Sequence, residues 1–461
     1  MNIHIADIFL YHSLIVLGEL LIVVSLIHML YKRRTPTSMI AWLLSMVLLP
    51  YVFVVLYFIF GSRKRTNRYK KSNIKFHISN SKNRQNKIDG LLRNCGISQV
   101  KKNQEFQIFT DPNKIYTLFM NCIKNATKSI YISTYVLKYD DTTKEILKAL
   151  GEKARQGIEV KLLIDSIGSW QLYFRRYHLK NLIDAGAHVE FFMPALKMPF
   201  RNYINLRNHR KIYMFDEKIV LSGGINLARE YLGDDKQTQR WKDILFSSIG
   251  SSSEDFFEVF ASDWFYASLQ RLKFEKKEFK DDGDTYVQIV PSGPDMEKDA
   301  LYEALLCAIY GASKRIWIVT PYFVPDDSLS QALIIARHKG VDVKLITPKK
   351  SNHLSADLIR SSFMRNLEDE GIEVWLYEGN MLHAKAIIFD DTCAMLGSVN
   401  FDNRSLFLNY EIATFVYTKR VIEEMHSWMS ILLHDSTKGT KKVSKFRIIM
   451  ENFMRIFALQ A

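Results

Sequence analysis

Two long apolar stretches open the chain and set its first sixty residues apart from the rest. Ile8 to Tyr31 is apolar except for one glutamate, two histidines and two serines, and Met39 to Phe60 contains no charged residue. At about 1.5 Å per helical residue, each stretch can cross a hydrocarbon core of roughly 30 Å. The pattern therefore predicts two transmembrane helices, 8–31 and 39–60, that form a hairpin within residues 1–62.

Two alternatives to this hairpin come from the same residues. Pro50 interrupts the second stretch, and a proline in a membrane segment is compatible with a kink or with a re-entrant segment. A cleaved signal peptide is a weaker alternative for the first stretch. No basic segment precedes it, its apolar run is long, and no A-x-A cleavage pattern follows it.

The distribution of Lys and Arg predicts the orientation of the hairpin. Residues 1–7 contain neither, the connection 32–38 contains three, and the stretch 63–82 contains eight and no acidic residue. The positive-inside rule then places both termini in the cytoplasm. Residues 63–105 are expected to form a basic juxtamembrane linker that is solvated and also attracted to anionic head groups.

From about Phe106 onward, short apolar runs alternate with segments of helical periodicity. Within 129–165 a strand pattern, a helix pattern and a second strand pattern follow one another, and the same order returns within 315–347. The sequences GIEVKLL and GVDVKLI in these two segments are near copies. Strand, helix and strand in sequence predict parallel βαβ units and an α/β fold, with a first lobe over 106–275 and a second over 285–435.

A more specific repeat follows each of these segments. Residues 208–226 and 382–400 both match H-x-K-x4-D-x6-G-[GS]-x-N. Such a set of identities arises by chance on the order of once in ten thousand chains of this length, so two copies indicate an internal duplication. The first copy contains His209, Lys211, Asp216, Gly223 and Asn226, and the second contains His383, Lys385, Asp390, Gly397 and Asn400.

The H-x-K spacing suits chemistry at a phosphate. Residues two apart on a strand project from the same face, so the histidine and the lysine lie side by side. The ammonium can neutralise a phosphate oxygen while the imidazole attacks phosphorus or transfers a proton. Two copies about a pseudo-twofold axis would bring two histidines to one centre, as covalent transfer at a phosphodiester requires. An isolated H-x-K would more often be a surface pair or a core histidine.

Composition and charge narrow the class of partner. The chain has 461 residues and a net charge of +14, which favours a polyanionic partner, either nucleic acid or an anionic membrane. More than half of this excess lies in 63–82, beside the apolar stretches. The four cysteines are far apart and form no CxxC pair, which fits a reducing, cytosolic catalytic region. No cluster has metal-ligand spacing, so we expect neither a metal nor a cofactor.

The duplicated motifs resemble the HKD signature of the phospholipase D superfamily, most closely that of bacterial cardiolipin synthases. The resemblance rests on NLRNHRK, GGINLAREYLG, TPYFVPDD and GSVNFDNRSLFLNYE, and SMIAWLLSMVLLPYVFVVLYFIFG resembles the second membrane segment of that family. It covers nearly the whole chain and is weakest before residue 30 and between about 67 and 107.

This resemblance implies two pseudo-symmetric phospholipase D-like α/β lobes with the active site between them. By analogy, His209 would be the nucleophile that forms a phosphohistidine, and His383 the general acid and then the base. The other residues to which it gives roles are Lys211, Lys385, Asn226 and Asn400 as phosphate ligands, Asp243 and Glu411 as carboxylates that orient the histidines, and Asp216 and Asp390 as supports of the site geometry.

The activity implied is that of a membrane-bound phosphatidyltransferase that makes cardiolipin and glycerol from two phosphatidylglycerol molecules. A hydrolytic phospholipase D and transfer to another alcohol remain open, because only the acceptor differs. Two departures from the family bear on the acceptor: Ser351-Asn352-His353 replaces Ser-Asp-His, and WKDIL replaces an aromatic-Arg-Asp-Thr-His pattern. An HKD-type nuclease is a more remote alternative, and a membrane scaffold without catalysis is the remotest.

The resemblance also implies the partners and the location. We expect phosphatidylglycerol and anionic membrane lipids as partners, and a multi-pass protein of the bacterial plasma membrane whose catalytic region is cytoplasmic. The oligomeric state is not predicted. The basic amphipathic tail, 436–461, is expected either to lie on an anionic surface or to pack on the domain as an ordinary helix.

Overall fold

The computed structural model describes residues 5–32, 36–61, 74, 76, 86–194, 205–234, 240–275, 279, 283–441 and 443–455. The N-terminal helices and the α/β region belong to two separate compact units, and each is described by itself. The predicted basic stretch 63–82 lies outside the described residues apart from 74 and 76.

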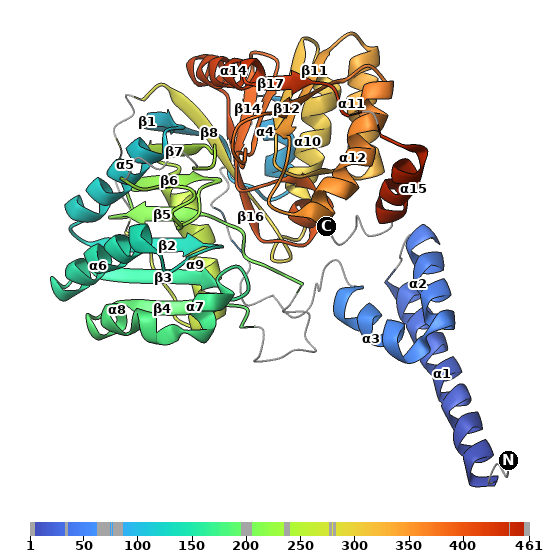
Figure 1. Ribbon diagram of the computed structural model, residues 1–461. Helices are drawn as coiled ribbons and strands as arrows, with labels where there is room; N and C mark the ends of the chain where they lie inside the picture. Colours follow the sequence, from blue (N-terminus) through green and yellow to red (C-terminus); the bar gives the residue numbers. More distant parts are fainter. Residues whose placement is uncertain are drawn as a thin grey trace. The chain divides into compact units, whose positions relative to one another are not determined.

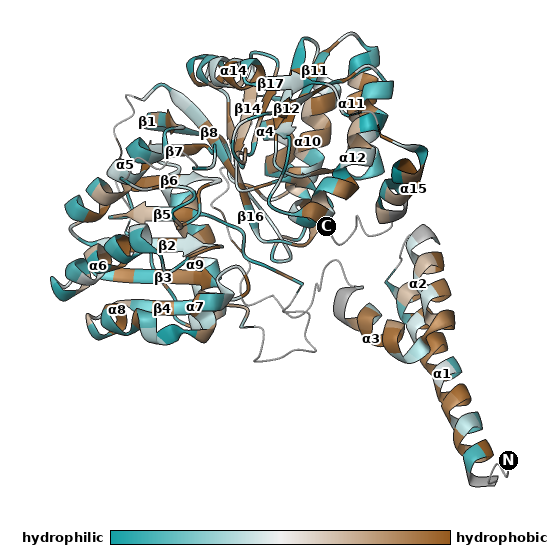
Figure 2. Cartoon of the chain, viewed as in Figure 1, coloured by the Kyte–Doolittle hydropathy of each residue, from teal (hydrophilic) through white to brown (hydrophobic). Residues whose placement is uncertain are grey.

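Three helices make up the N-terminal unit: α1 (Ile5–Tyr31), α2 (Pro36–Leu48) and α3 (Pro50–Phe60). Among the described residues, one helix, Asp7–Tyr31 within α1, is long and apolar enough to cross a membrane, as predicted for 8–31. Figure 2 shows that α1 and α3 are mostly hydrophobic.

The prediction of one continuous helix over 39–60 is wrong. The helix breaks at Leu49, which has φ −145° and ψ 78°, and a new helix begins at Pro50. Proline has no N–H to donate, and its ring disfavours the helical conformation of the residue before it. The break therefore follows from Pro50 itself.

One sheet of 15 described strands runs through the α/β region (Figure 1), in the order β17-β12-β11-β9-β13-β14-β16-β8-β1-β7-β6-β5-β2-β3-β4. The strands of its first half are β1 (Lys101–Phe109), β2 (Ser129–Thr134), β3 (Glu159–Asp165), β4 (His188–Phe192), β5 (Ile212–Phe215), β6 (Ile219–Gly223) and β7 (Leu245–Gly250). Those of its second half are β8 (Thr285–Ser292), β9 (Arg315–Val319), β11 (Asp342–Pro348), β12 (Glu373–Tyr377), β13 (Ala386–Phe389), β14 (Cys393–Gly397), β16 (Glu411–Val416) and β17 (Ser436–Lys438).

The two halves repeat one topology, which confirms the predicted pair of α/β lobes. Strands β2, β3 and β4 are parallel, as are β9, β11 and β12, whereas β5 and β13 run antiparallel to their neighbours. The central strands β1 and β8 pair antiparallel and join the halves, with Lys101 opposite Val287. Outside this sheet, β10 (Phe323–Val324) pairs with β15 (Phe401–Asp402).

Helices cover the sheet in both lobes. In the first half these are α5 (Pro112–Asn125), α6 (Asp141–Arg155), α7 (Trp170–Phe174), the 3-10 helix η1 (Arg176–Leu179), α8 (Lys180–Asp184) and α9 (Ser253–Ser268). The second half has α10 (Ala300–Gly311), α11 (Asp327–His338), α12 (Leu354–Asp369), α13 (Asn403–Phe407), α14 (Lys419–His434) and α15 (Lys445–Met454). The predicted helices within 129–165 and 315–347 correspond to α6 and α11.

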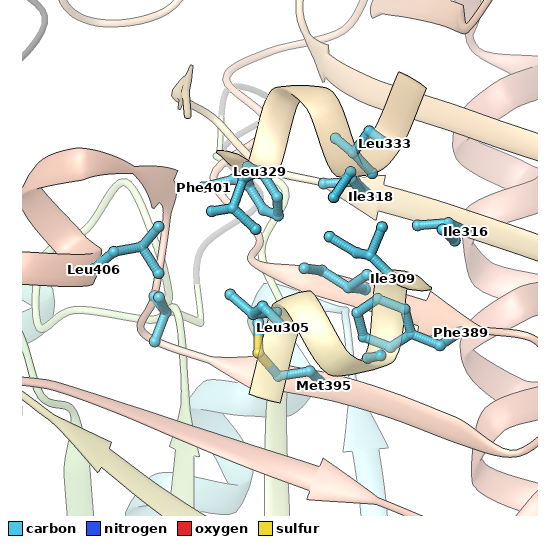
Figure 3. Packing of buried hydrophobic residues seen from close by; sticks show 14 of the residues in the cluster. Leu305, Ile309, Ile316, Ile318, Leu329, Leu333, Phe389, Met395, Phe401 and Leu406 are labelled. Carbon is cyan, nitrogen blue, oxygen red and sulfur yellow. The ribbon is translucent and has the colours of Figure 1, made fainter. Parts of the chain in front are cut away.

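Each lobe has its own hydrophobic core. In the second lobe, Leu305 and Ile309 of α10 pack with Ile318 of β9, Leu333 of α11 and Phe389 of β13 (Figure 3). Burial of one such side chain stabilises a fold by about 1.5–3 kcal/mol. Each core thus stabilises its own half of the sheet.

The expected linker 63–105 is structured in its last part. Helix α4 (Lys87–Asn94) places Ile88 and Leu92 in the core of the second lobe, and β1 begins at Lys101 in the sheet. The chain thus contributes to the second lobe before it builds the first.

The C-terminal helix α15 packs on α12. Ser362 on α12 donates a hydrogen bond to Asn452, and the Arg455 guanidinium lies 4.3 Å from the centre of the Phe363 ring. The opposite side of α15 exposes Phe446 and Ile449. The helix is therefore packed on the domain, and it also presents an apolar face outward; Lys442, Ile456 and Phe457 of the predicted tail lie outside the described residues.

Candidate active site

The two H-x-K segments enter the sheet at the seam between the lobes. His209 and Lys211 directly precede β5, and His383 and Lys385 directly precede β13. The backbone N–H of His209 donates to the Tyr410 carbonyl at 2.8 Å, and that of His383 donates to the Lys242 carbonyl at 2.7 Å. Each motif is thus hydrogen-bonded to the opposite half of the chain.

These backbone bonds bring each histidine to a carboxylate of the other half. Nδ1 of His209 lies 2.9 Å from Oε1 of Glu411, and Nδ1 of His383 lies 2.7 Å from Oδ2 of Asp243. The structure therefore brings together all four of these residues predicted from the sequence. Each of these two histidine–carboxylate pairs therefore combines one residue from each half of the chain.

The carboxylates determine which imidazole nitrogen is free to react. A carboxylate accepts a hydrogen bond from the N–H at Nδ1, which keeps the proton on Nδ1 and leaves the lone pair on Nε2. For His209, both oxygens of Glu411 lie within 3.0 Å of Nδ1, and no hydrogen bond to Nε2 is formed within the described residues. The lone pair on Nε2 of His209 is thus held in a fixed orientation and is available to a ligand.

The two carboxylates are supported differently. Glu411 accepts hydrogen bonds from the Ser398 hydroxyl and from Nδ2 of Asn409, the latter at 3.3 Å. Gly224 occupies the place equivalent to Ser398, and a Cβ there would lie 2.1 Å from Oδ1 of Asp243. The motif position that is Gly or Ser therefore differs with the neighbouring carboxylate. Gly224 leaves room for Asp243, and Ser398 donates a hydrogen bond to Glu411.

Both lysines are buried. Nζ of Lys211 donates to the His209 carbonyl at 2.8 Å, and Nζ of Lys385 lies 2.8 Å from Nδ1 and 3.1 Å from Nε2 of His383. Burial lowers the pKa of Lys211 to about 7, with the charge of Lys385 adding to the shift and Glu411 opposing it. Burial likewise lowers the pKa of Lys385 to about 8. An anionic phosphate at this centre would stabilise both ammonium groups.

Burial also lowers the pKa values of both histidines. For His209 the Lys211 charge contributes to the lowering and Glu411 opposes it. For His383 the pKa falls to about 3, because burial and the Lys385 charge together outweigh Asp243. Both imidazoles are therefore neutral at neutral pH before an anion binds, which is the state that a nucleophile needs.

Aromatic rings surround the two histidines. The Tyr135 ring meets His209 edge-on at 4.9 Å between centres, and His383 has Tyr231 at 5.1 Å and Trp241 at 5.4 Å. These rings fix the imidazoles and keep water from their sides. The sequence analysis did not single out these residues, although Tyr231 and Trp241 lie within or beside the segments that carry the resemblance.

The two motif asparagines have different surroundings. Oδ1 of Asn226 accepts a hydrogen bond from the backbone N–H of Val136 at 3.2 Å. Oδ1 of Asn400 is buried and has no partner among the described residues. Rotation of its amide would direct an NH₂ group to the same place, where it could donate to a phosphate oxygen. Asn400 is therefore better suited than Asn226 to bind a ligand.

The motif aspartates lie away from the histidines, at the far ends of β5 and β13. Asp216 accepts hydrogen bonds from the backbone N–H groups of Lys128 at 2.7 Å and Ser129 at 3.0 Å. Asp390 does the same for Lys314 at 2.7 Å and Arg315 at 2.9 Å. These bonds hold the first residues of β2 and β9. The structure does not bring either aspartate to the histidine centre.

Arg210, between the histidine and the lysine of the first motif, was missed by the sequence analysis. Its guanidinium is fully buried, with Nη1 2.6 Å from Asp263 in the first half and Nη2 3.0 Å from Asp295 in the second. Nε also donates to the Glu411 carbonyl at 3.0 Å. Arg210 therefore ties the lobes together beside the site. In sequence, Arg210 is distinguished by one feature: the second motif has Ala384 at the equivalent position.

Within the described residues, no group of three or more His, Cys, Asp or Glu side chains is arranged to hold a metal ion. The groups that the site brings together are two histidines, two lysines and their carboxylates, which suit chemistry at a phosphate.

Comparison with known proteins links this geometry to a family. A family model described as "Cardiolipin synthase, PLD-like domain" matches residues 119–264 and 305–433, and one described as "Phospholipase_D-nuclease N-terminal" matches 20–62. The two matches of the first model coincide with the two lobes, and the second model covers the C-terminal part of α1 and all of α2 and α3.

Curated relatives match over nearly the full length. A cardiolipin synthase from Clostridium perfringens is 32% identical over 447 residues, which cover 91% of this chain and 92% of the relative. Cardiolipin synthase 1 from Bacillus cereus is 30% identical over 468 residues, with 93% and 90% covered. Among solved structures, phosphatidylserine synthase from Haemophilus influenzae aligns with a TM-score of 0.60 at 16% identity, covering 81% of this chain and 97% of that one, and so shares its fold.

Proposed function

The chain belongs to the cardiolipin synthase family with phospholipase D-like domains, and we propose that it is a membrane-bound phosphatidyltransferase that makes cardiolipin and glycerol from two phosphatidylglycerol molecules. The observation that carries the proposal is the crossed pairing of the two histidines with Glu411 and Asp243. It supplies two oriented imidazoles at one buried, cationic centre.

In the first half-reaction, Nε2 of His209 attacks the phosphorus of the first phosphatidylglycerol. The P–N bond forms as the P–O bond to the head-group glycerol breaks. His383 gives its proton to the leaving oxygen, and glycerol departs. The bound phosphate anion and Asp243 favour the imidazolium form of His383 that this step requires.

In the second half-reaction, neutral His383 takes the proton from a head-group hydroxyl of the second phosphatidylglycerol. The hydroxyl oxygen attacks phosphorus, the P–N bond to His209 breaks, and cardiolipin forms. Lys211, Lys385 and Asn400 bind the phosphate oxygens throughout and stabilise the charge in both transition states.

Transfer to a lipid alcohol is favoured over hydrolysis by the surroundings of the histidines. His209 is 8% exposed and His383 5% exposed, and aromatic rings pack against both. A dry centre limits attack by water on the phosphohistidine. The full-length similarity to cardiolipin synthases supports the same choice.

We propose the cytoplasmic face of the bacterial plasma membrane as the location of the catalytic region. The apolar helix α1 supplies an anchor, and the four cysteines are all free thiols. The anchor would hold the site beside phosphatidylglycerol and other anionic lipids.

The test is a product assay with purified protein and phosphatidylglycerol labelled in its phosphate. We expect labelled cardiolipin from the wild type and none from His209→Gln or His383→Gln. His338→Gln, at an exposed histidine on α11, is the matched control and should remain active. Phosphatidic acid as the main product would instead assign the chain to hydrolysis.

A further inference from the structure

The apolar segment 36–60 forms two helices that double back. Helix α2 follows α1 after a short connection and runs back along it. Helix α3 begins after the break at Leu49. A Cβ on Gly18 of α1 would lie 3.3 Å from the Pro50 ring, and the Tyr51 hydroxyl donates to the Leu14 carbonyl. The turn between α2 and α3 therefore lies beside the middle of α1.

The far end of α3 lies beside the C-terminal end of α1. The Tyr57 hydroxyl and Nδ1 of His28 form a hydrogen bond of 2.7 Å, and the Tyr57 ring also meets Trp42 of α2 at 5.4 Å. From Pro50 to Tyr57, α3 thus ascends along α1 in the same direction as α1. It ends near the level at which α2 began.

Helix geometry gives the depth of this excursion. Gly18 is 13 positions before Tyr31, which is about 20 Å along a helix. A hydrocarbon core is roughly 30 Å thick. Helices α2 and α3 therefore reach about two thirds of the way across and return.

The packing along α1 changes at the same depth. From Asp7 to Leu17 every side chain is exposed. Beyond that, Met29 of α1 is completely buried in a cluster with Met46 of α2 and with Val54 and Tyr57 of α3. Among the described residues, α1 is therefore the one helix that continues beyond this depth, whereas three helices pack together up to it.

The turn between α2 and α3 is compatible with lipid surroundings. The N–H of Leu49 donates to the Ser45 carbonyl at 3.1 Å, and the Leu49 carbonyl accepts from Phe53 at 2.9 Å. Pro50 has no N–H to satisfy. These bonds satisfy part of the backbone at the turn, which a bilayer interior favours.

The outward faces of α2 and α3 are apolar. Leu44, Val47 and Leu48 of α2 are each more than 60% exposed, and Val52 and Val55 of α3 are about half exposed. Lipid acyl chains would cover these side chains.

We propose that α2 and α3 form a re-entrant segment that enters the bilayer and returns to the same face, and that α1 is the one described helix that crosses the membrane. This inference rests on the membrane location proposed above. It differs from the sequence prediction of two crossings. The N-terminal end of α1 then lies on the face opposite to the catalytic region.

The charge distribution favours this arrangement over a two-crossing hairpin. Two crossings would leave the three basic residues of 32–38 outside the cell. With a re-entrant segment, those three residues and the eight of 63–82 share the cytoplasmic face, and residues 1–7, which have no Lys or Arg, are outside.

The test is the accessibility of single cysteines in the full chain, with its four native cysteines replaced by alanine. Asn2→Cys, Thr35→Cys and Thr66→Cys would be treated with a membrane-impermeant maleimide, in intact cells and in inside-out vesicles. We expect Asn2→Cys to be labelled only from outside, and Thr35→Cys and Thr66→Cys only from inside.

Two outcomes would overturn the inference. A two-crossing hairpin would reverse the first two positions, with Asn2→Cys labelled from inside and Thr35→Cys from outside. Labelling of all three positions from inside would mean that α1 does not cross. Cardiolipin formation by each variant is measured separately, so that a failure of the proposed activity is distinguished from a failure of the topology.

Discussion

His209 and Glu411 are 202 residues apart in the chain, and Nδ1 of the histidine lies 2.9 Å from a carboxylate oxygen of the glutamate. In the symmetry-related pair the contributions are reversed: the histidine, His383, comes from the second half of the chain and the carboxylate, Asp243, from the first. Each imidazole is therefore oriented only when both lobes are folded against each other. The duplication yields one active site rather than two.

The first prediction concerns these carboxylates. Glu411→Gln and Asp243→Asn should each lower kcat by about 10²–10⁴-fold, because an amide no longer fixes the tautomer or stabilises the imidazolium. KM should change much less. Steady-state assays of cardiolipin formation would measure both.

The surface pair formed by His338 and Glu370, 3.1 Å apart, provides a matched control. Glu370→Gln should leave kcat unchanged. Equal losses in Glu370→Gln and Glu411→Gln would contradict a specific role for Glu411.

The second prediction concerns Arg210. Arg210→Met should destabilise the α/β region by about 3–5 kcal/mol, because Asp263 and Asp295 lose the cation between them. Burial raises the pKa of Asp263 to about 7 even with Arg210 present. Thermal unfolding of the purified protein would report the loss.

Two further variants separate charge from packing at this position. Changing Asp263 and Asp295 to asparagine in the Arg210→Met background should restore much of the stability. Arg420→Met removes an exposed ion pair with Asp284 and should cost less than about 1 kcal/mol. If Arg210→Met were no less stable than Arg420→Met, the cross-lobe role would be wrong.

The sequence predicted much of this architecture because its signals are local. The βαβ patterns and the two H-x-K motifs lie within short segments, so the paired lobes could be predicted and the candidate residues of the site could be proposed. The pairing of His209 with Glu411 and of His383 with Asp243 could not be predicted, because it depends on backbone pairing between the two lobes. The family resemblance indicated the two carboxylates but not which histidine each of them contacts.

Other features depend on contacts between distant parts of the chain. Arg210 resembles a surface residue in sequence, and only Asp263 and Asp295, far along the chain, explain its burial. The second membrane segment illustrates the opposite case. Pro50 was recognised as a possible interruption, but hydropathy cannot show whether the chain continues or turns back after it.

The third prediction separates the motif aspartates from the catalytic groups. Asp216 has φ 54° and Asp390 φ 53°, a conformation that asparagine tolerates well. Asp216→Asn should weaken the bonds to the start of β2 and lower stability by about 1–3 kcal/mol. At temperatures where the variant is folded, its kcat should stay within a few-fold of wild type. Thermal midpoints and kcat of the same preparation test this, and a loss of kcat as large as that of His209→Gln at full stability would refute it.

The fourth prediction concerns the buried lysines and pH. As pH rises from 7 to 9, free Lys211 loses its proton, so kcat/KM should fall. Stability should respond with the opposite sign. The folded pKa of about 7 lies below the unfolded value of 10.5, so the unfolded state binds more protons in this window and the Lys211 contribution to stability rises with pH.

The comparison variant for this test is Lys211→Met. The difference in unfolding free energy between wild type and variant should change by up to about 1.4 kcal/mol per pH unit between pH 7 and 9. Unfolding measured across this range, together with kcat/KM, gives both trends. A pH-independent difference would show that Lys211 keeps its ordinary pKa in the fold.

The most direct test of the central claim is to trap the covalent intermediate. A phosphate-labelled phosphatidyl ester with a p-nitrophenolate leaving group needs no proton on departure, so His383→Gln should still form the intermediate and then fail to pass it on. We predict that label accumulates on His383→Gln, that it maps to the peptide containing His209, and that His209→Gln binds none. Label on His209→Gln, or on a peptide without His209, would contradict the assignment of His209 as the nucleophile.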